Sequence, residues 1–111
     1  MTTLKPIIPG SLLTGSAATY YTCPASTTCA VKKLTFCNTD AAVAYTITVY
    51  RVPAAGSAGT TNIVVNAKPL APAESWECYL MNHFLAAGDT IQAFCSTNAK
   101  VSIVGSGVEI V

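Results

Sequence analysis

The 111-residue sequence predicts an all-β protein, a single-domain, jelly-roll-like β-sandwich with about eight strands. Three observations predict this fold class. Apolar and polar side chains alternate with a period of two along most of the chain, whereas helical periodicity is hard to find. Turn-forming residues separate the alternating segments at intervals of roughly 8–12 residues. The length suits one domain, because a single core commonly serves a chain of roughly 100–150 residues.

The first half of the chain supplies four of the expected strands. In the third, Leu34 and Phe36 share one face, and the polar turn at residues 38–40 ends it, because Asn and Asp side chains hydrogen bond to their own backbone. The fourth shows the clearest alternation, with Ile47 and Val49 on the face that we expect to be buried. In order, the four strands are expected at residues 11–14, 18–23, 29–37 and 43–52.

The second half supplies the other four strands. The sixth expected strand carries Trp76 and Cys78 on one face, and the seventh carries Ile91 and Cys95 in register. Glycines at residues 105–107 interrupt the last strand, which predicts a bulge or a switch between sheets. These four strands are expected at residues 62–67, 74–81, 90–96 and 100–111.

The first ten residues, MTTLKPIIPG, are expected to form an N-terminal arm outside the sandwich domain of residues 11–111. The two prolines of the arm have no backbone N–H to donate, so they are poorly suited to an interior strand. The arm is either a frayed terminus or a segment that reaches a neighbouring subunit.

Charged residues make up 10% of the chain and leave a formal net charge of +1. A nucleic-acid binder needs a basic face, and the chain has one basic doublet, Lys32-Lys33, so no nucleic-acid partner is expected. So little charge on a small domain indicates that part of its surface is covered in the working state, in a homo-oligomer or a larger assembly. No apolar run of about 20 residues predicts a membrane span, and residues 1–10 do not look like a secretory signal.

The five cysteines are expected to be buried, reduced thiols, because their number is odd and no secretory signal is recognisable. Neither a metal site nor a cofactor is expected, since the cysteine spacing gives no CxxC pair and His83 is the one histidine. Catalysis is not expected either. Glu74 and Glu77 would face opposite sides of a strand, and His83 is interpreted as a loop residue bonded to backbone.

Aromatic side chains and the arm supply the candidate interface residues, because aromatic residues are enriched at binding surfaces. Trp76 has two interpretations, a residue of the core or of a subunit boundary, and a platform on which a sugar stacks. The candidates are Lys5, Ile7, Ile8, Tyr20, Tyr50, Arg51, Trp76 and Tyr79.

Several segments, taken in order, resemble a pattern in small virion proteins of tailed bacteriophages. YTCPA at residues 21–25 and the strand ending in CNT at residue 39 match a "YTVPAG" turn followed by a strand that ends in "CNT". LAPAESWE at residues 70–77 is similar to an "IPAGETWE" turn. LAAGDTIQA at residues 85–93 and GSGVEI at residues 105–110 complete the pattern, which covers about residues 20–111.

The resemblance implies an all-β virion structural protein. We expect a capsid decoration (cement) protein that binds the major capsid protein lattice as a homo-oligomer, a dimer or a trimer, and stabilises the head. Its expected location is the outer capsid surface of a virion assembled in the host cytoplasm. The alternatives are a tail or fibre-attachment component and a carbohydrate-binding module on the virion surface.

Overall fold

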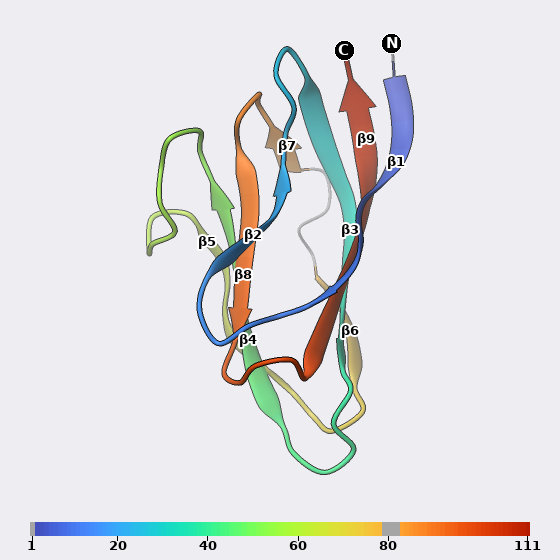
Figure 1. Cartoon of the computed structure of the whole chain (residues 1–111), viewed down its shortest axis with the longest axis vertical. Helices are drawn as coiled ribbons and strands as arrows, with labels where there is room; N and C mark the ends of the chain where they lie inside the picture. Colours follow the sequence, from blue (N-terminus) through green and yellow to red (C-terminus); the bar gives the residue numbers. More distant parts are fainter. Residues whose placement is uncertain (1, 79–82) are drawn as a thin grey trace.

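The computed structural model describes residues 2–78 and 83–111. Within them the chain forms nine strands in two antiparallel sheets that face each other, so the predicted all-β sandwich is confirmed (Figure 1). The described residues include no helix that could cross a membrane. The strands are β1 (Thr2–Leu12), β2 (Ala18–Thr22), β3 (Thr28–Asn38), β4 (Tyr45–Val52), β5 (Ile63–Leu70), β6 (Ser75–Cys78), β7 (His83–Leu85), β8 (Thr90–Cys95) and β9 (Val101–Ile110).

The five-stranded sheet has the order β1-β9-β3-β6, and β7 also pairs with β3. β3 is long enough to pair with β7 near its start and with β6 near its end. The four-stranded sheet has the order β2-β8-β4-β5. Consecutive strands therefore often lie in different sheets, as in a jelly roll, and β7 is a strand that the sequence pattern did not predict.

The core lies between the sheets and consists of the side chains that alternate inward. Leu34 and Phe36 of β3 and Ile47 and Val49 of β4 are all fully buried, as the alternation predicts. Transfer of such apolar side chains out of water is the main driving force that holds the two sheets together.

The expected arm is instead edge strand β1, which pairs with β9 along its length. Ile7 and Ile8 are buried in the core, whereas Pro6 and Pro9 remain exposed. The register between β1 and β9 shifts on both sides of Ile8. Bulges of this kind, on an edge strand, accommodate prolines that lack a donor. The prolines therefore excluded an interior strand and not an edge strand.

The glycines of β9 allow other strands to approach closely and do not interrupt the strand. A Cβ at Gly107 would lie 2.4 Å from the carbonyl oxygen of Ala30, and one at Gly105 would lie 2.8 Å from the Leu34 side chain. β9 runs without a break, and the register shifts occur along β1 and at Lys32 in β3. The predicted bulges therefore occur, but they lie in β1 and β3, the two strands that pair with β9, and not in β9 itself.

Asn38 is fully buried at the end of β3, where connections between the two sheets meet. Its Nδ2 donates to the carbonyl oxygens of Val43 (2.9 Å), Leu70 (3.3 Å) and Ala71 (3.2 Å). Its Oδ1 accepts from the backbone N–H of Asp40 at 3.0 Å. One amide thus links the β3–β4 connection to the β5–β6 connection.

Replacing Asn38 by Ala should lower the free energy of unfolding by about 2–4 kcal/mol, because buried carbonyl oxygens would lose their donor. Chemical denaturation measures this loss. Asn98→Ala, at an exposed position, is the matched control and should change the stability by less than about 0.5 kcal/mol. Equal stability of the two variants would contradict the role assigned to Asn38.

Candidate functional site

The candidate interface residues do not lie on one surface. Ile7 and Ile8 are core residues, so their assignment to an interface was wrong for the folded chain. Tyr79 lies outside the described residues. The remaining five candidates are distributed over both sheets and their edges.

Tyr20 and Tyr50 are both partly buried by contacts within the chain. The Tyr20 hydroxyl donates to the carbonyl oxygen of Leu12 at 3.3 Å, and its side chain packs against the core. Tyr50 stacks on Phe94, with ring centroids 6.2 Å apart. Their rings contribute to the packing of the chain itself, so neither is a freely projecting anchor.

Arg51 connects elements at the end of the sandwich opposite Asn38. Its Nε donates to the carbonyl oxygen of Phe84 at 2.8 Å, and its Nη2 lies 3.5 Å from Oδ2 of the buried Asp89. Asp89 also accepts from the backbone N–H groups of Ala54 and Ala86, each at 2.9 Å. Arg51 thus fixes β4 of one sheet to β7 of the other, a role that depends on contacts distant in sequence.

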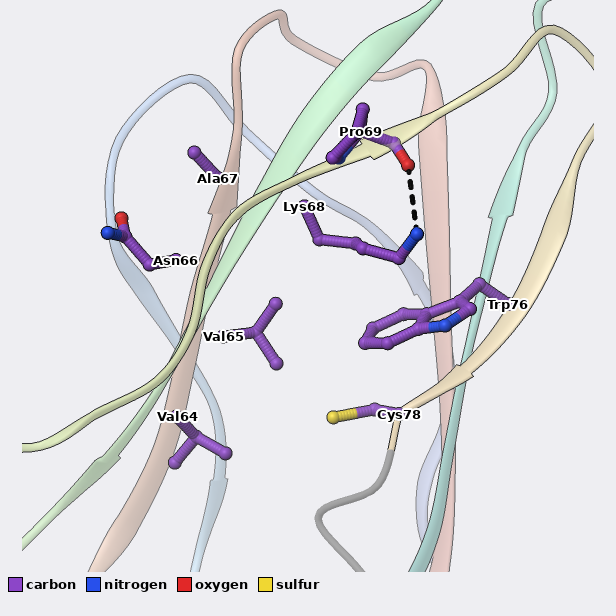
Figure 2. Close-up of a pocket in the computed structure, with 8 residues that line it drawn as sticks. All are labelled: Val64, Val65, Asn66, Ala67, Lys68, Pro69, Trp76 and Cys78. Atoms are coloured by element: carbon purple, nitrogen blue, oxygen red, sulfur yellow. Dashed lines mark hydrogen bonds between the residues drawn. The ribbon is translucent and has the colours of Figure 1, made fainter.

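A pocket of about 410 Å³ opens between edge strands β5 and β6 (Figure 2). Val65 and the Trp76 ring point into it, and Lys68 lies over Trp76, with Nζ 5.3 Å from the ring centroid. Trp76 also stacks with Phe36, with centroids 6.2 Å apart. A sugar that stacked on Trp76 would have to displace one of these neighbours. The pocket is lined by Val64, Val65, Asn66, Ala67, Lys68, Pro69, Trp76 and Cys78.

A bulge in β5 shapes one wall of this pocket. Ile47 pairs with Lys68 and Val49 pairs with Val65, so β5 has one more residue than β4 between these pairs. Ala67 has a positive φ of 50°, and its N–H donates to the Thr48 hydroxyl at 3.2 Å. A bulged edge strand with a lysine is a poor template for pairing with another strand.

The outer face of the five-stranded sheet carries an apolar row that crosses four strands. Leu4 pairs with Val108, Val108 with Ala30, and Ala30 with Phe84, so these side chains lie side by side. Leu4 is 82% exposed and Phe84 is 60% exposed, and Ile110 extends the row along β9. We call this set the apolar row. The sequence pattern did not predict this row, because it depends on β7 and on the bulge at Lys32. Before that bulge the odd-numbered residues of β3 face the core, and after it the even-numbered residues do.

A partly buried polar cluster joins the inner side of β9 to β2. The Tyr21 hydroxyl donates to Glu109 Oε2 at 2.5 Å, and the Lys5 ammonium lies 3.2 Å from the same oxygen. These two contacts lower the pKa of Glu109, the Tyr21 hydrogen bond most strongly. Burial raises the pKa of Tyr21 far above its usual value, and the Cys29 thiol 3.0 Å away and Glu109 add to the rise.

No protein-family model matches the chain, and no curated protein matches it either. Solved structures do match. A chain in the structure of infectious bursal disease virus, Gx strain, has a TM-score of 0.54 and 14% identity over 98% of this chain and 32% of that chain. A mutant VP2 protein of the same virus, in derived T=1 particles, has a TM-score of 0.54 and 13% identity over 99% of this chain and 31% of that chain.

A chain of the T13 particle of this virus has a TM-score of 0.53 and 10% identity, over 97% of this chain and 30% of that chain. Our chain therefore spans 30–32% of the length of these neighbours. At such low identities the likeness concerns the fold, a jelly-roll-like sandwich that also occurs in chains of viral particles.

The Glu109 contacts predict a stability that falls in acid. The folded-state pKa of Glu109 lies below its unfolded value of about 4.3, so its contribution is complete above that pH and is lost as the pH falls through the folded-state pKa. Glu109→Gln should therefore lose less stability than the wild type between pH 6 and pH 3 in urea denaturation. Glu77→Gln, whose carboxylate pairs with Lys33 on the surface, is the control and should follow the wild type. Parallel curves for wild type and Glu109→Gln would contradict the assignment.

Proposed function

We propose that the chain is a structural component of a virus particle, a decoration protein that binds the major capsid protein lattice on the head of a tailed bacteriophage. The observation that carries the proposal is the fold likeness to chains of viral particles over 97–99% of this chain. The ordered resemblance to small virion proteins of tailed bacteriophages gives it its finer form.

The surface of the chain supports a role in contact with a partner. The β5–β6 pocket brings Lys68 together with apolar side chains, an amide and the Cys78 thiol. Charged side chains are few, and four of them neutralise one another in the ion pairs Lys5–Glu109 and Lys33–Glu77. Such a surface suits many shallow contacts repeated by symmetry more than long-range attraction of a charged ligand.

The apolar row is the surface that we assign to the capsid shell. Leu4 and Phe84 place large apolar side chains in water, and the register of four strands holds them in one plane. Burying exposed side chains of this size against a partner contributes roughly 1.5–3 kcal/mol each. A homo-oligomer, a dimer or a trimer, would present the row more than once and so raise the avidity for a symmetric lattice.

The alternative function, a tail or fibre-attachment component, is supported by the same likeness in fold. It differs in the part of the particle to which the chain would bind. The carbohydrate alternative is less well supported, because Phe36 and Lys68 already contact the Trp76 ring. The Tyr20-Tyr21 pair is the second platform that a sugar could use, but Tyr20 packs against the core and Tyr21 is buried.

Purified protein mixed with tailed phage particles that lack this chain should bind the heads saturably and symmetrically, as seen by sedimentation and electron microscopy. Leu4→Asp and Phe84→Asp should each weaken binding by about tenfold or more, because a carboxylate would be desolvated in the contact. Val43→Asp is the matched control, since Val43 is 48% exposed and lies near Asn38, away from the apolar row. It should bind like the wild type.

The same experiment separates the alternatives. Density at the tail or at one vertex alone would overturn the decoration role in favour of the tail component. Failure to bind any part of the particle would overturn both. Normal binding by Leu4→Asp and Phe84→Asp would overturn the assignment of the apolar row.

A further inference from the structure

We infer that Cys23 and Cys29 form a site of covalent modification, at which a peroxide converts the two thiols into a disulfide that links the two sheets. The inference does not depend on the proposed function. It rests on the contact between the two sulfur atoms and on the backbone that carries them, the residue after β2 for Cys23 and β3 for Cys29.

The two thiols are direct neighbours in a closed environment. Their Sγ atoms lie 2.6 Å apart, and Cys23 and Cys29 are 1% and 0% exposed. The Cys23 thiol is also within reach of the Thr27 carbonyl oxygen, at 3.3 Å. The Leu85 carbonyl oxygen lies 3.5 Å from the same sulfur, and each of the two thiols has the other as a direct neighbour.

The backbone around each cysteine belongs to a different sheet. The Cys23 N–H donates to the carbonyl oxygen of Asp89, and the Cys23 carbonyl oxygen accepts from Gly88, next to β8 of the four-stranded sheet. Cys29 pairs with Glu109 of β9 and with Leu85 of β7 in the five-stranded sheet. A bond between the sulfurs would therefore close the sandwich covalently at the end opposite Asn38.

Burial keeps the pair reduced until a small oxidant reaches it. Burial raises the pKa of the Cys23 thiol to about 12, and the neighbouring Cys29 adds to the rise, so at neutral pH the thiol stays protonated and reacts slowly. The connection between the two cysteines that precedes β3, residues 24–27, is short, with Pro24, Ala25 and Ser26 exposed. Opening of this turn, or entry of a molecule little larger than water, exposes the sulfurs without unfolding the sheets.

The chemistry balances with hydrogen peroxide as the oxidant. One sulfur attacks the peroxide, the O–O bond breaks, and a sulfenic acid and one water form. The second thiol then attacks the sulfenic sulfur, the S–O bond breaks, and the disulfide and a second water form. The two thiols give up two electrons and two protons, and both oxygen atoms of the peroxide leave as water.

The sequence allows this modification to be measured in one peptide. Trypsin cleaves after Lys32 and spares the Lys5–Pro6 bond, so peptide 1–32 contains Cys23 and Cys29 and none of the other three cysteines. The native full-length chain is treated with dilute hydrogen peroxide, unfolded, alkylated, digested and analysed by mass spectrometry. We expect peptide 1–32 to lose about 2 Da and to carry no alkyl group, and dithiothreitol should restore two alkylatable thiols.

Controls separate a fold-directed crosslink from general oxidation. Cys37→Ser removes a half-exposed thiol on the outer face and should leave the crosslink unchanged, whereas Cys23→Ala and Cys29→Ala should each abolish it. The crosslinked chain should also melt higher than the reduced chain, by on the order of 5–10 °C. Peptide 1–32 that carries two alkyl groups, or that gains oxygen as sulfinic acid without a crosslink, would overturn the inference.

Discussion

The buried amide of Asn38 is the constraint on which one end of the sandwich depends. The chain passes between the sheets at residues 39–44 and again at residues 71–74, and both crossings hydrogen bond to this one side chain. A third crossing, between β8 and β9, is attached to the same end. The N–H and the hydroxyl of Thr39 both donate to the carbonyl oxygen of Lys100 in this crossing. In Figure 1 these connections lie together at the end away from the chain termini. A buried amide has enough donors and acceptors to satisfy several crossings at once, which an apolar side chain cannot do.

The opposite end is held differently, by the buried carboxylate of Asp89 and by the side chains of two cysteines. Asp89 accepts from two backbone N–H groups and from Arg51, and Cys23 and Cys29 meet across the sheets beside Tyr21 and Glu109. Along the sides, the prolines and register shifts of β1 and the bulge of β5 make two of the sheet edges unsuitable for adding a further strand. Assembly through faces, such as the one with the apolar row, is therefore more consistent with the architecture than assembly through strand pairing at these edges.

The alternation of apolar and polar residues predicted those features of the fold that local interactions determine. The alternation of Leu34 with Phe36 and of Ile47 with Val49 identified the buried faces, because one-sided burial requires a period of two. It failed for β1, because the two prolines disfavour an interior strand and still permit an edge strand. It failed for β7, which has three residues and is held by its pairing with β3. The apolar row and the Arg51 contacts join residues far apart in sequence, and the bulge at Lys32 reverses the parity on which a face assignment depends. Such features follow from register and topology, which the sequence pattern does not contain.

If this chain is a repeated structural component of a virus particle, as we propose, its copy number in purified virions tests that role most directly. Quantitative mass spectrometry with labelled peptide standards would count the chain relative to the major capsid protein. Our account predicts many copies per particle, in a simple ratio to the major capsid protein that reflects the lattice symmetry. A few copies per particle would contradict lattice decoration, and absence of the chain from virions would contradict a structural role altogether.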